Sequence, residues 1–200
     1  SMSTDGALDG NGIGIAIVDS GIYGAHTAFT DTLTGQSRVV VNIDFTGEGR
    51  TDDPYGHGTH VAAAAAGNGL IAKGEYIGIA PRAKLLNLRV LNSTGTGSVS
   101  NVLAAFNWLL SNASIYNVRV VNLSIGMPAI DSYKFDPLCV SARELVDRAL
   151  LALRRQASRL AVAMRERARA LHTRARAQAR RRRRARHRGA RARAARRGAR

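Results

Sequence analysis

Residues 55–62 of the chain read Tyr-Gly-His-Gly-Thr-His-Val-Ala, and they open an alanine-rich apolar run. Gly56 and Gly58 flank the first histidine, so the backbone can turn tightly there without side-chain bulk beside the imidazole of His57. The alanine-rich run has high helix propensity, which predicts a closely packed helix that begins near His57 and stops at Gly67. A helix N-terminus disfavours a positive charge, so we expect a neutral imidazole that can accept a proton.

Two other interpretations of this stretch remain open. His57 and His60 are three residues apart and could bind one metal ion, although the sequence shows neither a His-Glu-x-x-His pattern nor a third ligand. Both could also be ordinary structural histidines. Neither interpretation explains the flanking glycines or the sequence upstream, so we favour a catalytic base.

Short apolar runs alternate with helix-forming segments on both sides of this stretch. Runs of this kind that end in loops are typical of buried parallel strands. We predict strands at residues 13–18, 38–45, 83–91 and 119–123. The apolar spacing of residues 99–110 predicts an amphipathic helix, and Asp136-Pro137 indicates the start of another. This alternation predicts an α/β fold with a doubly wound parallel sheet.

The first predicted strand ends at Asp19-Ser20-Gly21. Open α/β sheets place their functional sites at the C-terminal ends of parallel strands, so Asp19 is a candidate site residue. A turn aspartate that caps its own backbone is the competing interpretation.

The composition of the chain changes abruptly in its last third. Residues 1–152 carry 10 Lys and Arg against 13 Asp and Glu, whereas residues 153–200 carry 20 Arg and one acid, so the formal net charge of +16 comes from the second segment. Ile, Asn, Lys, Phe, Tyr, Trp and Pro are all absent after Val140. Translation of GC-rich DNA in a shifted frame produces this pattern, and we expect such a shift between Asp147 and Leu153.

The arginine-rich segment suggests a different kind of function. Helical spacing persists over residues 143–172, but beyond Thr173 the density of like charge should fray any helix in water. Twenty arginines would bind polyanions non-specifically, with a steep dependence on salt. No aromatic residue lies among them, so we expect no sequence-specific reading of nucleic acid. A membrane-surface helix over residues 143–172 is a third possibility.

Other features of the sequence exclude whole classes of protein. Cys139 is the only cysteine, which excludes an internal disulfide. No segment is apolar for long enough to predict a transmembrane helix. No signal peptide is evident at the start of the chain.

The two stretches Asp19-Ser20-Gly21 and His57-Gly58-Thr59-His60-Val61-Ala62, in this order, resemble the active-site motifs of the subtilisin-like serine proteases, the subtilases. Leu88-Arg89-Val90-Leu91 with Gly95-Thr96-Gly97-Ser98 is similar to one edge of the family's substrate cleft, and Asn122-Leu123-Ser124-Ile125-Gly126 to the other. The resemblance covers residues 11–152. It implies a partial subtilisin-like parallel sheet with flanking helices, and a hydrolase that cleaves polypeptide substrates with an Asp/His/Ser triad.

The resemblance implies a role for each matching residue. Asp19 is then the acid of the triad and His57 its general base, because a buried carboxylate bonded to Nδ1 fixes the tautomer and leaves Nε2 free. His60 is expected to point into the structure, and Met127 to narrow a side-chain pocket. An extended peptide would bind through backbone hydrogen bonds to two edges of the cleft. These edges are Gly95, Thr96 and Gly97 on one side and Ser124, Ile125 and Gly126 on the other.

Two elements of the family pattern are missing from the chain. The family's nucleophile lies in a Gly-Thr-Ser-Met-Ala-like segment that opens a helix, and Ser98, Ser132, Ser141 and Ser158 all lack that context. The oxyanion-hole Asn of an Ala-Gly-Asn segment is missing too. Residues 65–68 imitate that segment, but they end the predicted histidine helix.

The resemblance also bears on metals, cofactors and location. A position that often supplies a calcium-binding Asp is occupied by Ala28, so we expect no metal site there and no cofactor. The family implies a secreted protein. Because the sheet lacks its later strands, we expect residues 1–152 alone to be poorly soluble.

The sequence therefore predicts a truncated subtilase domain over residues 1–152 and an Arg/Ala-rich tail over residues 153–200. The family function is serine endopeptidase, but without its nucleophile the chain should be inactive. The alternative is a pseudoprotease or fragment that binds polyanions through its tail.

Overall fold

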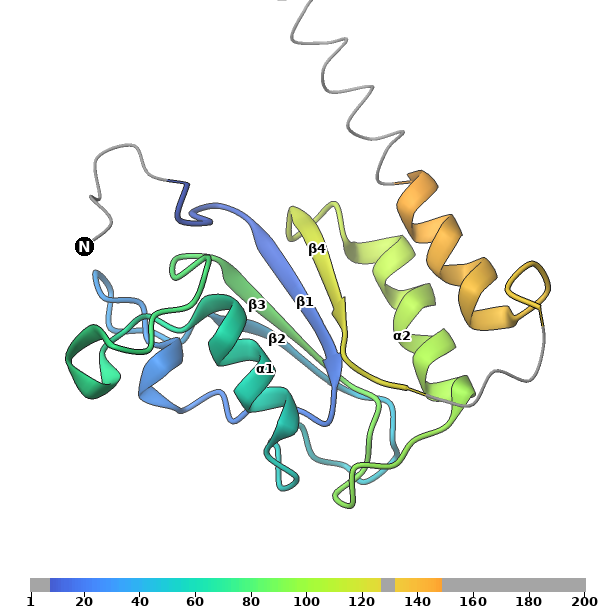
Figure 1. The fold of residues 1–200 in the computed structure, drawn as a ribbon, viewed down its shortest axis with the longest axis horizontal. Helices are drawn as coiled ribbons and strands as arrows, with labels where there is room; N and C mark the ends of the chain where they lie inside the picture. The colour runs from blue at the N-terminus through green and yellow to red at the C-terminus, as the bar shows by residue number, and fades with distance from the viewer. Residues whose placement is uncertain (1–7, 127–131, 149–200) are drawn as a thin grey trace, which may run out of the picture. The chain divides into compact units, whose positions relative to one another are not determined.

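A sheet of four parallel strands forms the centre of the fold (Figure 1). The computed structural model describes residues 8–126 and 132–148. The strands are β1 (Gly14–Asp19), β2 (Val39–Asp44), β3 (Lys84–Arg89) and β4 (Val118–Leu123), in the order β2-β3-β1-β4. Each coincides with a predicted strand, so the predicted α/β fold with a partial parallel sheet is confirmed.

β1 lies between β3 and β4, and all six of its residues are buried. Successive side chains of a strand point to opposite faces of the sheet. Ile15 and Ile17 therefore contribute to one apolar cluster and Ala16 and Val18 to another. This double burial explains why β1 has a continuous apolar sequence rather than an alternating one.

Helices cover both faces of the sheet, because parallel strands need crossover connections (Figure 1). α1 (His57–Ala66) connects β2 to β3 and packs in the cluster of Ile15 and Ile17. α2 (Val99–Asn112) connects β3 to β4 and packs in the cluster of Ala16 and Val18. Two short 3-10 helices, η1 (Thr27–Phe29) and η2 (Ile71–Gly74), lie in the connections.

A further helix occupies residues 137–148. Pro137 is its first residue, and Asp136 Oδ1 accepts a hydrogen bond of 3.0 Å from the backbone N–H of Cys139, as an N-cap residue does. The predicted start of a helix at Asp136-Pro137 is therefore confirmed. Its Leu138 and Leu145 pack against the same cluster as α2.

Arg38 is a buried cation that sequence reasoning overlooked. Its side chain is 4% exposed and donates to the carbonyls of Ala28, Ala66 and Ala83 at 2.5–2.9 Å. Burial lowers the pKa of this guanidinium, and the charge of Asp31 opposes that effect. The guanidinium of Arg38 is therefore bound by three backbone carbonyls, from η1, from α1 and from the residue before β3, instead of by a carboxylate.

The chain divides into two units between residues 149 and 150, and the described residues belong to the first. The helical spacing predicted beyond residue 148, the frayed tail, Met127 and the proposed shift of reading frame lie outside the described residues. The boundary at residue 152 stays a prediction. None of the described helices is long and apolar enough to cross a membrane.

Candidate active site

Asp19 and His57 meet at the C-terminal end of the central strand. Asp19 is the last residue of β1 and is fully buried, whereas His57 is the first residue of α1 and its side chain is 41% exposed. His57 Nδ1 lies 2.7 Å from Asp19 Oδ1. An ionised carboxylate can only accept hydrogen bonds, so the contact selects the neutral tautomer with its proton on Nδ1. The second ring nitrogen, Nε2, is then the basic one.

The glycines around His57 have two different functions. Gly56 has φ +89°, in the left-handed region, and precedes the first residue of α1. Gly58 is needed for close approach, because a Cβ there would overlap the carbonyl oxygen of Gly21 and lie 3.1 Å from Asp19 Cβ. The first turn of α1 can therefore lie directly against the end of β1. α1 ends at Ala66 before Gly67, as predicted.

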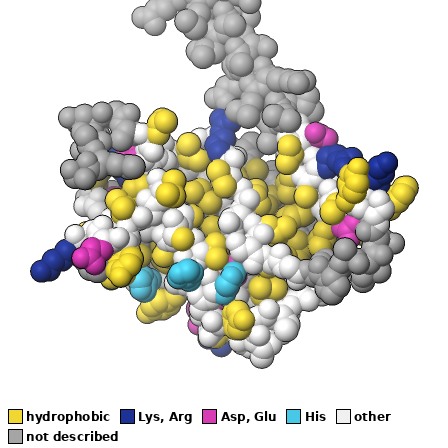
Figure 2. Space-filling view, in the orientation of Figure 1, with side chains coloured by type: hydrophobic (Ala, Val, Ile, Leu, Met, Phe, Trp, Pro, Cys, Tyr) yellow, Lys and Arg dark blue, Asp and Glu magenta, His cyan; other side chains and the backbone are white. Residues whose placement is uncertain are grey.

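The prediction that His60 points into the structure is wrong, because the described structure leaves its side chain exposed. Histidine side chains reach the surface on the face shown in Figure 2. Among residues 8–126 and 132–148, no group of three or more His, Cys, Asp or Glu residues could hold a metal ion. The metal-site interpretation of His57 and His60 therefore has no third ligand in this part of the chain.

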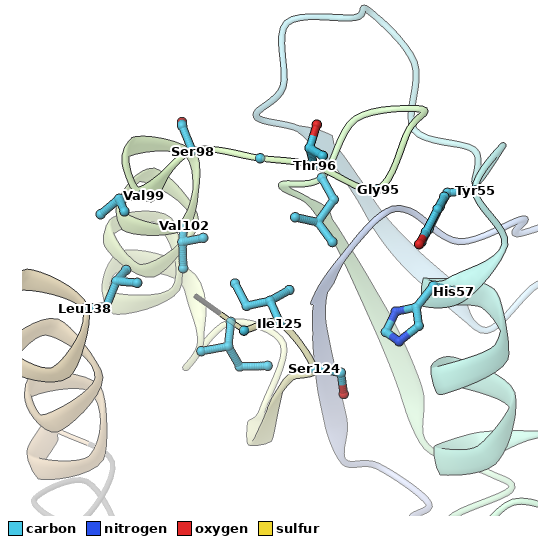
Figure 3. Close-up of a pocket in the computed structure, with 14 residues that line it drawn as sticks. Tyr55, His57, Gly95, Thr96, Ser98, Val99, Val102, Ser124, Ile125 and Leu138 are labelled. Carbon is cyan, nitrogen blue, oxygen red and sulfur yellow. The ribbon is translucent and has the colours of Figure 1, made fainter. Parts of the chain in front are cut away.

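A cleft of about 510 Å³ opens beside His57 (Figure 3). All six predicted peptide-binding residues line it: Gly95, Thr96, Gly97, Ser124, Ile125 and Gly126. One edge comes from the loop before α2 and the other from the segment after β4. The structure therefore brings the two predicted edges to one cleft, next to the candidate base.

Apolar side chains also line the cleft. Leu91 and Leu123 belong to the stretches that the sequence matched to its edges, whereas sequence reasoning did not assign Val99, Val102 and Leu138 to the cleft. Tyr55 opens the stretch 55–62, and its ring packs against Gly95 on the edge formed by the loop before α2, because a Cβ on Gly95 would overlap that ring. Gly95 also has φ +77°. By contrast, a Cβ on Gly126 would meet no atom of the described residues within 4 Å.

Arg89 is a second buried cation close to the site, and no sequence signal singled it out. It lies opposite Asp19 in the register of β1 and β3, and its fully buried side chain donates to the carbonyl of Ser20 at 3.0 Å. It also forms ion pairs with Asp44, at 3.4 Å, and with Glu48. Arg89 therefore holds the loop after β2 against the end of β1.

The pKa values of both acidic partners of Arg89 are lowered, but Arg89 is the largest cause only for Glu48. Burial raises the pKa of Asp44, but hydrogen bonds from Thr46 and Gly49 and the charge of Arg89 together bring it below its ordinary value. The hydrogen bond from Arg89, followed by one from the Ser93 backbone, lowers the pKa of Glu48. Glu48 accepts from both Ser93 N and Ser93 Oγ, at 3.2 and 3.0 Å. Glu48 thereby joins the loop after β2 to the loop that carries Gly95.

Known proteins with similar sequences are proteases. Serine protease AprX from Bacillus subtilis (strain 168) is 30% identical over 149 residues, which cover 68% of this chain and 31% of AprX. Proteinase T from Parengyodontium album is 36% identical over 123 residues, which cover 60% of this chain and 38% of Proteinase T. The chain spans about a third of the length of these relatives.

A solved structure has the same fold. The crystal structure of a cold adapted subtilisin-like serine proteinase matches with a TM-score of 0.51 and 25% sequence identity, over 76% of this chain and 47% of that one. The sequence of residues 10–164 matches the model of the subtilase family. This match begins close to the predicted start of the resemblance, and it includes Asp19, His57 and both edges of the cleft. The chain belongs to the subtilase family of subtilisin-like serine proteases.

Proposed function

We propose that this chain supplies the acid, the base and one part of the substrate cleft of a serine endopeptidase. The observation that carries the proposal is the 2.7 Å contact between His57 Nδ1 and Asp19 Oδ1, beside a cleft lined by the predicted peptide-binding residues. With Nδ1 held by the carboxylate, Nε2 would take the proton from an attacking serine hydroxyl. The Asp19 carboxylate would then stabilise the imidazolium that forms.

The cleft supports an extended peptide as the substrate. Its two edges are backbone segments around Gly95–Gly97 and Ser124–Gly126, which would donate and accept main-chain hydrogen bonds. The side chains of Leu91, Val102 and Leu138 make much of its lining apolar. We therefore propose polypeptide substrates, with apolar side chains accommodated between α2 and the loop at residues 91–97. We also propose that the protein is secreted, and membership of the family is the only support for this.

By itself, the chain is proposed to be inactive. No serine in it has the Gly-Thr-Ser-Met-Ala-like context of the family's nucleophile, and the oxyanion-hole Asn has no counterpart. Asp19 and His57 then have no hydroxyl to activate. No metal or cofactor is part of this proposal, and the side chain of Ala28 offers no oxygen ligand for calcium. The alternative function is the binding of polyanions by the tail, and the tail lies outside the described residues.

A chimera tests the roles of Asp19 and His57. Residues 1–148 would be joined to the part of AprX that follows the matched region, which would supply a nucleophile. We expect hydrolysis of a peptide substrate by the chimera, with a loss in kcat of about 10⁴-fold for Asp19→Asn and about 10⁶-fold for His57→Gln. His60→Gln is the control and should change kcat little, because its side chain is exposed. Full activity in the His57→Gln chimera would overturn the proposal.

The parent chain tests the proposed inactivity. We expect no hydrolysis of the same peptide by the unaltered chain at concentrations where the chimera is active. Hydrolysis that disappears with His57→Gln would contradict this expectation, since it would show that the chain contains its own nucleophile.

A further inference from the structure

The loop before α1 holds His57 through an aspartate that the catalytic chemistry does not use. We propose that Asp53 is a positioning residue, which keeps the first turn of α1 in place so that His57 Nδ1 faces Asp19. The inference rests on the proposed function of the Asp19–His57 pair. It assigns no contact with substrate to Asp53.

Both carboxylate oxygens of Asp53 accept hydrogen bonds from residues on the two sides of His57. Oδ1 accepts from the backbone N–H of Gly56 at 2.9 Å, and Oδ2 accepts from the backbone N–H of Thr59 at 2.7 Å. His57 thus lies inside a short segment whose ends are bound to one carboxylate. A carboxylate that accepts backbone N–H groups forms a stronger bond than a neutral acceptor does.

Ser20 connects Asp53 to the acid of the pair. Its hydroxyl donates to Asp53 Oδ1 at 2.8 Å and accepts from the backbone N–H of Gly58 at 3.0 Å. Its backbone N–H donates to Asp19 Oδ1 at 2.7 Å, the same oxygen that faces His57 Nδ1. Ser20 is fully buried. One network therefore positions the acid and the base together.

The conformation of the helix start explains why an outside carboxylate is needed. The N-cap residue of α1 is Gly56, which has no side chain to cap the helix. The free N–H groups of a first turn must find other partners, and a negative charge there is favourable. Asp53 and Ser20 bind the N–H groups of Gly56, Gly58 and Thr59. They replace a cap that glycine cannot provide.

The structure therefore predicts what the loss of Asp53 would change. Without its carboxylate, the first turn would no longer be fixed relative to Ser20, and the imidazole would rotate away from Asp19 for part of the time. In the sequence, Asp53 is one of two adjacent acids in a polar loop, and nothing there distinguishes it from Asp52. Asp52 instead pairs with Arg50 at the surface, at 2.6 Å.

The test is nitrogen NMR of the His57 ring in the full chain at neutral pH. The wild type should show one dominant tautomer, protonated on Nδ1, with slow exchange of that proton with water. Asp53→Asn removes the negative charge and replaces one carboxylate oxygen with an NH₂ group. The N–H of Thr59 then faces either that NH₂ group or an uncharged oxygen. We expect a mixture of tautomers and exchange of the Nδ1 proton about tenfold faster or more, as loss of a charge-assisted hydrogen bond produces.

Asp31→Asn is the matched control. Asp31 also accepts two backbone hydrogen bonds, from Leu33 and Thr34 at 2.8 and 2.9 Å, but it caps its own loop. The His57 signals should be unchanged in this variant. Trp108 stacks on Tyr116 beside the other apolar cluster, so its fluorescence reports separately that each variant is folded.

Ser20→Ala decides the question if Asp53→Asn fails to fold. It removes the link between Asp53 and Gly58 but keeps the Asp53 carboxylate, and we expect faster exchange in it too. Unchanged His57 signals in the folded variants would overturn the inference. Asp19→Asn separates this result from failure of the proposed function. If the wild-type signals do not depend on Asp19, the proposed pair itself is wrong.

Discussion

At the scale of the residue, Arg89 shows how a buried cation supports a site without taking part in its chemistry. Its guanidinium is fully buried and bonds to Asp44, Glu48 and the carbonyl of Ser20. Removing one partner of a buried ion pair leaves the others uncompensated, which costs more than the pair contributes.

Arg89→Met is therefore expected to lower the free energy of unfolding of the full chain by about 3 kcal/mol. Urea denaturation followed by Trp108 fluorescence measures the change. Arg82→Met is the control, because Arg82 is exposed and forms a pair with Asp9 at 3.5 Å near the surface, so its loss should cost less than about 1 kcal/mol. Equal stability of the two variants would contradict the role given to Arg89.

Glu48 gives the fold a dependence on pH. Its pKa in the folded state lies below the ordinary value of 4.5, first because of the hydrogen bond from Arg89. A lowered pKa stabilises the folded state fully above pH 4.5, and this stabilisation is lost as the pH falls through the folded-state pKa. The urea midpoints of wild type and Glu48→Gln should therefore differ most near neutral pH and converge in acid.

Glu75→Gln provides the comparison for Glu48, since Glu75 is exposed and is not among the partners of Arg89. Its difference from wild type should stay the same across the titration. A Glu48→Gln difference that is equally constant would contradict the linkage.

The sequence alone was enough to locate the candidate site residues that belong to a local sequence pattern. Asp19 follows a buried strand, and His57 lies between glycines, so both could be located without coordinates. Arg38 and Arg89 could not, because their partners come from segments that are 10 to 69 residues away along the chain. His60 was placed wrongly because a motif fixes residue types and not the side-chain exposure that the surrounding chain creates.

At the scale of the element, the start of α1 depends on the absence of a side chain at residue 58. Gly58→Ala would place a Cβ against the carbonyl oxygen of Gly21, which is backbone and cannot rotate aside. We expect a loss of about 1–3 kcal/mol in the free energy of unfolding, as overpacking costs, measured by urea denaturation. In the matched change Gly126→Ala, the added Cβ meets no atom of the described residues within 4 Å and should have little effect. If Gly58→Ala were the milder change, α1 would not approach β1 as described.

The elements themselves were largely predictable. A continuous apolar run located β1, because a strand covered on both faces has no polar side to show. β2 and β4 are partly exposed, and shorter apolar runs were enough to locate them. The helix at 137–148 could be located from Asp136-Pro137 because capping acts within a few residues. The 3-10 helices η1 and η2 were missed, since three or four residues leave no periodic signal.

At the scale of the whole molecule, β4 is one of the two outer strands of the described sheet, and its apolar residues are incompletely covered. Val120 is 50% exposed, and Val121 and Leu123 are each 38% exposed. Outer strands with uncovered apolar residues tend to pair with other chains. We expect residues 1–152 alone to associate in analytical ultracentrifugation, and Val121→Lys to reduce that association.

Val146→Lys is the control for that experiment. Val146 is 57% exposed but lies on the helix at 137–148, so adding a charge there should leave the association unchanged. A monomeric fragment that unfolds cooperatively would contradict the expectation. Equal effects of the two substitutions would show that net charge, and not the strand edge, controls association.

The ion pair between Arg89 and Glu48 has a mechanical consequence for the cleft. Glu48 also holds Ser93, two residues before Gly95, while Arg89 holds the carbonyl of Ser20 beside Asp19. One edge of the cleft and the backbone beside Asp19 are therefore attached to the same two side chains. A peptide bound at that edge as proposed would therefore be linked to Asp19 through Glu48 and Arg89, so substrate binding and the orientation of the carboxylate would change together.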